Sequence, residues 1–190
     1  MTPQASFKVT TNTPATIVPQ EEDYSVEWKD LGSVEAEILI LSICPVNEYQ
    51  DILSAFEDKE ISFSSHPQVR GKKARFVSLS SSAQKNHAIS FDEIEHFVNN
   101  LRSVLQSMKN LHLVLPLGVS AHIAVLEACG IPMTHLDFRS NFITFLPDGL
   151  LIGDLLHPAT EEHFFSKLDD FLPHIIDSLN TKSSASLGTQ

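Results

Sequence analysis

The side chain with the clearest potential for chemistry is His157, which directly follows an apolar run and precedes a stretch with helical character. A histidine at such a junction could donate a hydrogen bond to a leaving-group oxygen and stabilise the negative charge that develops there. The chain has nine histidines, so a surface or structural role for His157 fits its position equally well.

Polar residues at a second junction, after residues 37–44, form another candidate cluster. Asn47, Glu48 and Asp51 could orient an attacking water through an amide or carboxylate oxygen. The alternative is a solvated turn in which one carboxylate caps the next helix, and residue type alone favours it. Gly118 follows a third apolar run, where its lack of a side chain suits either a ligand or tight packing.

These candidates must be positioned by alternating strands and helices. Short apolar runs rich in β-branched residues predict buried strands, whereas apolar residues at spacings of three and four predict amphipathic helices. We expect strands at residues 37–44, 74–80, 111–117, 142–146 and 150–156, and helices at 50–58, 90–108, 119–129 and 160–179. Pro173 should kink or divide the last helix.

This alternation predicts a three-layer α/β/α fold around a largely parallel central sheet. Sites in such folds lie at the carboxyl ends of the strands. We therefore expect residues 44–48, 80–81, 118–120 and 157–159 to converge on one crevice.

Composition predicts one domain. Hydrophobic residues make up 42% of the chain and charged residues 19%, which is typical of a globular protein. We expect an extended or partly disordered arm at residues 1–30, a single α/β domain at 31–180 and a polar tail at 181–190. The sequence contains no apolar run of membrane-spanning length and no signal-peptide pattern, which predicts a soluble, cytoplasmic protein without a membrane partner.

Charge and cysteine content limit the function further. The formal net charge of −11 disfavours broad non-specific binding to DNA. The segment 70–75, RGKKAR, is either a solvated loop before a strand or a local patch that contacts phosphate. Cys44 and Cys129 are too few for a four-thiolate iron–sulfur cluster, and no Cys/His spacing resembles a zinc site, so we expect no metal or other cofactor.

Four short motifs occur in a fixed order along the chain: SICPV at 42–46, SFDEI at 90–94, LGVSA at 117–121 and HPA at 157–159. In this order they resemble motifs of the uracil-DNA glycosylase superfamily. The family counterparts are a Gly-x-x-Pro-Gly-like loop, a helix start Thr/Ser-x-x-Glu-Ile, a strand end Leu-Gly-x-x-Ala and a His-Pro-Ser strand end. The resemblance spans roughly residues 35–175.

The resemblance implies hydrolysis of the N-glycosidic bond to uracil or another damaged base that is flipped out of single- or double-stranded DNA. It implies that His157 steadies the departing base and that Asn47 or Glu48 orients the water. The residues implied to bind substrate are Pro45, Phe56, Phe63, Ser80, Gly118 and Pro158, with Phe56 or Phe63 stacking on the base.

Several positions depart from the family motifs. Ser42 and Val46 stand in place of glycines, Ala159 in place of a serine, and Ser78 or Ser80 where the family has a base-reading asparagine. These departures suggest altered specificity or lost catalysis. One alternative is a non-catalytic glycosylase-fold module for protein interaction in replication or repair. Another is a small-molecule or nucleotide-binding protein whose resemblance is accidental.

Overall fold

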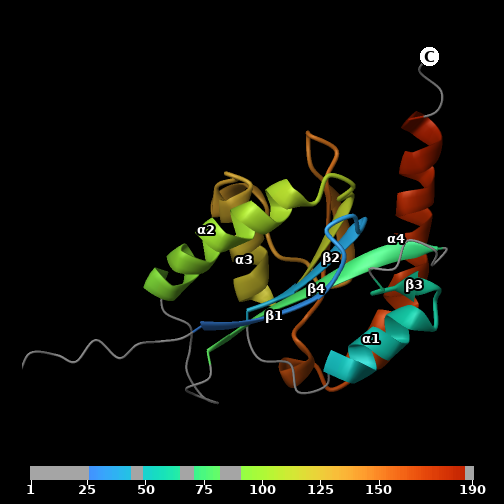
Figure 1. Ribbon diagram of the computed structural model, residues 1–190, viewed down its shortest axis with the longest axis horizontal. Coiled ribbons are helices and arrows are strands. Elements are labelled where there is room, and N and C mark those ends of the chain that lie inside the picture. The colour runs from blue at the N-terminus through green and yellow to red at the C-terminus, as the bar shows by residue number, and fades with distance from the viewer. Residues whose placement is uncertain (1–25, 44–48, 65–70, 82–90, 187–190) are drawn as a thin grey trace, which may run out of the picture.

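A computed structural model describes residues 26–43, 49–64, 71–81 and 91–186 of the 190-residue chain. These residues form a twisted β-sheet with helices on both faces (Figure 1). No helix within these ranges is long and apolar enough to cross a membrane.

The sheet has strand order β1-β4-β2-β5-β7-β6, with the short strand β3 paired to β4 outside this path. Its strands are β1 (Val26–Gly32), β2 (Ile38–Ser42), β3 (Ile61–Ser62), β4 (Lys72–Ser81), β5 (Leu113–Leu117), β6 (Phe142–Phe145) and β7 (Leu151–Asp154). Every residue of β2 and β5 is buried, as expected for central parallel strands covered on both faces.

Two pairs of helices cover the sheet. The helices are α1 (Tyr49–Glu57), α2 (Phe91–Ser107), α3 (Val119–Ala128) and α4 (Phe164–Ser186), with short 3-10 helices at Met133–His135 (η1) and Pro158–Thr160 (η2). One buried apolar cluster joins α1 and α4 to one face of the sheet, and a second joins α2 and α3 to the other face. The chain therefore has the predicted three layers, which Figure 1 shows with α2 and α3 on one side of the strands and α1 on the other.

The sheet was predicted to be largely parallel, but it is mixed. The pairings β2–β4, β2–β5 and β5–β7 are parallel, whereas both edge strands run antiparallel to their neighbours. β1 was not predicted and begins inside the expected arm, since Val26 to Gly32 pairs along β4. α4 remains one helix despite Pro173, begins at Phe164 instead of residue 160, and extends into the expected tail.

The register brings the carboxyl ends of the parallel strands to one edge. Ser42 at the end of β2 is aligned with Ser78 of β4 and with Leu117 at the end of β5. Leu117 in turn bridges to Leu155, the residue after β7. We call this side of the sheet the carboxyl edge and the opposite side the amino edge.

The connections also reverse direction at the carboxyl edge. The chain leaves β2 toward α1 on one face, whereas it leaves the adjacent strand β5 toward α3 on the other face. Diverging connections of this kind open a crevice outside the carboxyl ends of the two strands, which is where α/β sheets bind ligands. The ends of β2 and β5 are therefore the candidate place for a ligand site in this fold.

Candidate functional site

Gly118 and His157 are in contact at the carboxyl edge. Gly118 precedes α3 and has a φ of 93°, a backbone conformation that residues with a Cβ rarely adopt. A Cβ built on Gly118 would lie 3.2 Å from the Cβ of His157 and 3.7 Å from its backbone nitrogen. The Gly118 amide also donates to the carbonyl of Leu155, at 2.7 Å. The absence of a side chain at Gly118 therefore allows the β7–η2 junction to pack against the start of α3.

The backbone around His157 fixes the protonation pattern of its ring. His157 caps η2, and its Nδ1 accepts a hydrogen bond from the Ala159 amide at 3.2 Å. Because an amide can only donate, Nδ1 is unprotonated and a neutral ring carries its proton on Nε2. A neutral His157 therefore has its N–H on Nε2, an atom that is covered by protein in this structure, and the residue as a whole is 9% exposed. Thr160, the first residue of the last helix predicted from the sequence, instead ends η2 and donates its hydroxyl to the His157 carbonyl.

The structure describes only some of the other predicted site residues. Pro158 is half-buried at the start of η2, next to His157. Ser80 belongs to β4, where its backbone pairs with Glu27 of β1. Pro45, Asn47 and Glu48 follow β2 outside the described residues, so the proposed water-orienting groups remain a prediction.

Phe56 and Phe63 lie in the hydrophobic core and not at an open surface. Phe56 is 1% exposed and Phe63 5%, and both belong to the cluster beneath α1 and α4. Their rings pack edge to face, with centroids 6.1 Å apart. Stacking on a base needs an exposed ring face, so the structure gives these two rings a packing role.

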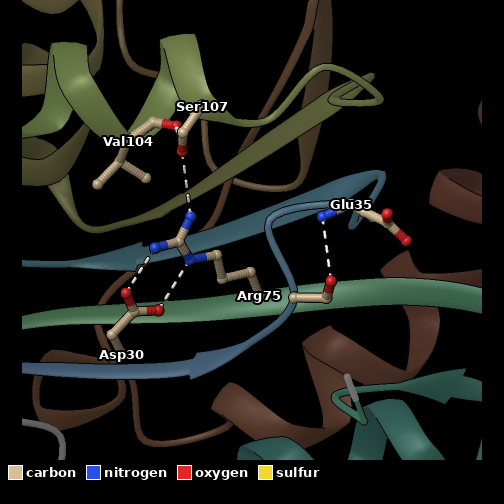
Figure 2. Close-up of polar contacts among 6 residues, drawn as sticks. Asp30, Glu35, Arg75, Val104 and Ser107 are labelled. Atoms are coloured by element: carbon tan, nitrogen blue, oxygen red, sulfur yellow. Dashed lines mark hydrogen bonds and ion pairs between the residues drawn. The ribbon is translucent and has the colours of Figure 1, made fainter. Parts of the chain in front are cut away.

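The described part of the basic segment, residues 71–75, lies at the amino edge, away from His157. Arg75 is buried and donates two hydrogen bonds to the Asp30 carboxylate of β1, at 2.8 and 2.5 Å, and a third to Ser107 of α2 at 3.4 Å (Figure 2). The bond to Asp30 raises the pKa of the guanidinium above its usual value. Lys72 pairs with Glu37 at 3.7 Å. These charges therefore hold β1, β4 and α2 together, and the described part of the segment offers no phosphate patch at the carboxyl edge.

Sequence reasoning missed a buried histidine–carboxylate pair close to the candidate site. His122 of α3 and Asp154 of β7 are 2% and 3% exposed, and His122 Nδ1 lies 2.7 Å from Asp154 Oδ1. His122 Nε2 lies 3.2 Å from the Leu136 carbonyl, and the Arg139 amide donates to Asp154 Oδ2 at 3.1 Å. Both ring nitrogens thus face acceptors, which favours the protonated imidazolium.

The pair connects α3, β7 and the segment that leads into β6, close to the carboxyl edge. His122 is four residues from Gly118 and Asp154 is three residues from His157, so the pair fixes α3 to β7 just below the Gly118–His157 contact. It also binds the segment that leads into β6, through Leu136 and Arg139. A histidine four residues after Gly118, on a mostly apolar helix, was the available sequence signal for this pair.

A surface hollow of about 380 Å³ lies at the amino edge, near the ends of α2 and α3. Its polar lining includes Arg102, Gln106 and Asp148, together with Cys129. Burial raises the pKa of the Cys129 thiol, and Asp148 adds to the effect, so the thiol is not an activated nucleophile. The hollow therefore lies at the opposite edge of the sheet from His157. Catalytic groups of α/β folds do not usually lie at the amino edge.

Within the described ranges, no group of three or more histidine, cysteine, aspartate or glutamate side chains could hold a metal ion. A scan against protein-family models finds none that matches the chain. A search of curated proteins likewise finds no match.

Proposed function

We propose that this chain is a divergent member of the uracil-DNA glycosylase superfamily that hydrolyses the N-glycosidic bond of a uracil or another damaged base. The observation that carries the proposal is the contact of Gly118 with His157 at the carboxyl edge, with the His157 proton held on Nε2. Two motifs that resemble the family, 40 residues apart in the sequence, thus meet at the place where this type of sheet binds ligands.

The proposed chemistry assigns one role to each part of the edge. The bond between the sugar C1′ and the base nitrogen breaks, a water supplies hydroxyl to C1′, and the base departs as an anion that then takes up the water proton. The Nε2–H of His157 donates to the base oxygen on which negative charge develops. A neutral donor suffices for this role, which fits a ring whose Nδ1 is occupied by an amide. Asn47 or Glu48 would orient the water.

The buried pair of His122 and Asp154 supports this site as a positioning device. It is covered by protein, and each of its polar atoms already has an acceptor or donor, so it does not itself contact a base. Its effect on the reaction would act through the placement of Gly118 and His157.

The experiment incubates the purified protein with single- and double-stranded oligonucleotides that each carry one uracil, and then treats them with alkali. Strand breaks at the uracil, with release of free uracil, support the proposal. The absence of both breaks and base release, with uracil and with a panel of deaminated and alkylated bases, contradicts it.

A non-catalytic module for protein interaction in replication or repair is the second candidate, and two observations favour it. The net charge is −11, and Lys72 and Arg75 of the basic segment form ion pairs at the amino edge. The edge strand β6 also exposes Phe145, at 69% of its surface. A protein that neither releases a base nor binds DNA at low salt would favour this candidate over the glycosylase.

A further inference from the structure

Arg139 and Phe142 form an exposed cation–aromatic pair at the start of β6. The guanidinium carbon of Arg139 lies over the Phe142 ring, 5.7 Å from its centroid. Phe142 is 48% exposed, which is unusual for so large an apolar side chain, and Arg139 is exposed as well. Within the described ranges, Arg139 has no carboxylate within ion-pair distance, whereas Lys72, Arg75 and Lys167 each have one.

The turn that carries the pair is attached to β7 by hydrogen bonds from backbone amides. The Arg139 amide donates to the Asp154 carboxylate at 3.1 Å, and the Asn141 amide donates to the Asp154 carbonyl at 2.7 Å. Asn141 adopts a left-handed conformation with φ of 59°, which turns the chain into β6. Asp154 is itself bound to His122, so the whole turn is attached to the core. A surface pair on such a turn is preorganised for a ligand.

The pair also lies at the carboxyl edge. β6 runs antiparallel to β7, and Phe142 is aligned with Asp154. Asp154 precedes His157 by three residues, a separation of about 10 Å along an extended chain. A nucleotide next to a base held at His157 would therefore come within reach of Arg139 and Phe142.

The chemistry of the pair matches one class of ligand. Aromatic rings and guanidinium planes stack on the faces of unpaired bases, and the guanidinium can also bind a phosphate. Stacking of this kind requires bases that are not already stacked in a duplex. An unpaired cation matters more on a chain of net charge −11, because the overall surface repels phosphate.

The geometry points to Arg139 and Phe142 as a stacking platform for single-stranded DNA, which contacts a nucleotide that flanks the base at His157. This inference rests on the proposed function, since it names the strand that the same site would hold. The inference implies that the substrate is single-stranded DNA or a duplex that is locally opened.

The test measures binding of a fluorescent single-stranded oligonucleotide without uracil, by anisotropy at low salt, so that the readout does not depend on catalysis. Phe142→Ala should weaken binding by about five- to 150-fold, the range found for loss of one base stack. Arg139→Gln should weaken binding and reduce the slope of log affinity against log salt by about 0.7, the value for one phosphate contact with a single strand.

Phe145→Ala is the matched control. Phe145 is on the same strand and is more exposed, at 69%, but it is paired with Leu151, whose side chain packs in the cluster beneath α1 and α4. Facing partners in a sheet share a face, so Phe145 and Phe142 lie on opposite faces. Phe145→Ala should change the affinity by less than about twofold if stacking is confined to one platform.

The outcomes separate the two proposals. Normal binding by Phe142→Ala, or an equal loss in Phe145→Ala, overturns the platform and leaves base excision to its own assay. Platform-dependent binding without excision of any base supports the platform and contradicts the catalytic proposal. A wild-type protein that does not bind the oligonucleotide, or that instead self-associates through Phe142 in sedimentation, overturns the platform.

Discussion

Gly118 and His157 lie so close together that one additional carbon atom at Gly118 would press on the histidine, with 3.2 Å between the two Cβ positions. The two residues belong to different junctions, β5–α3 and β7–η2, and their contact joins the carboxyl ends of neighbouring parallel strands. His157 therefore has its position set by a glycine that the chain reaches 39 residues earlier.

Gly118→Ala should impair activity more than it impairs folding. The backbone of Gly118, with φ of 93° and ψ of 167°, costs a residue with a Cβ about 1–3 kcal/mol of unfolding free energy, and displacement of His157 should reduce base excision by about 100-fold. Gly130→Ala is the control, because Gly130 also has a positive φ, of 71°, but nothing lies within 4 Å of its Cβ position. Equal excision rates for the two variants, measured under single-turnover conditions, would mean that the Gly118–His157 contact does not position the histidine.

The buried pair should make stability depend on pH. Burial lowers the pKa of His122, but the hydrogen bond and charge of Asp154, the Leu136 carbonyl and the charge of Asp137 together raise it by more, so the net pKa lies above its usual 6.5. The folded state then binds the proton more tightly than the unfolded state. The stabilisation is complete below about pH 6.5 and is lost as the pH rises through the raised pKa.

Urea unfolding of the wild type and Asp154→Asn, from about pH 5.5 to about pH 9, measures this effect. The difference in unfolding free energy between the two proteins should be largest at the acidic end and should shrink as the pH rises. Asp148→Asn controls for loss of a carboxylate at an exposed turn, where the Leu150 amide donates to the side-chain oxygen. A difference that stays constant over the whole range would show that His122 is not the titrating partner.

The basic segment should contribute to stability and not to DNA binding. Arg75→Ala removes both hydrogen bonds to Asp30 and should lower the unfolding free energy by about 1–3 kcal/mol. Lys72→Gln and Lys73→Gln together should leave the affinity for single-stranded DNA unchanged within about twofold, because they lie at the amino edge. A loss comparable to that of Arg139→Gln would place the DNA on the opposite side of the sheet.

Phe56 should affect stability alone. Phe56→Leu removes ring contacts with Phe63 and should lower the unfolding free energy by about 1 kcal/mol. The excision rate per folded molecule should remain at the wild-type value, because the ring is buried beneath α1 and α4. A large loss of rate in a protein with an unchanged melting temperature would restore the stacking role suggested by the family resemblance.

The elements that could be predicted from the sequence are those with a strong local pattern. The runs that form β2 and β5 are apolar on both faces, and α2 has a long apolar stripe, so packing and local preference agree. β1 could not be predicted because its pairing depends on β4, more than 40 residues away, and its sequence VEWKDLG lacks a clear period. Antiparallel edge strands of this kind made the sheet mixed.

The position of Gly118 and His157 at the carboxyl edge was predictable from the sequence, but the buried groups beside them were not. Gly118 and His157 were found because each follows an apolar run, and a strand end fixes which edge a residue occupies. His122 and Asp154 are single polar residues within apolar stretches, and only the tertiary fold reveals that they are partners. The sequence predicts that Phe142 belongs to a strand, but it does not predict that the side chain is exposed. Exposure on an edge strand depends on which other elements cover it.

The most direct test of the account compares base excision by His157→Ala with excision by the wild type under single-turnover conditions, using a single-stranded oligonucleotide with one uracil. His174→Ala, which changes an exposed histidine on α4, is the control, and circular dichroism checks that all three proteins are folded. If His157 donates to the departing base, the wild type and His174→Ala release uracil and His157→Ala is slower by at least about 100-fold. Excision by His157→Ala at the wild-type rate, or no excision by the folded wild type, would contradict it.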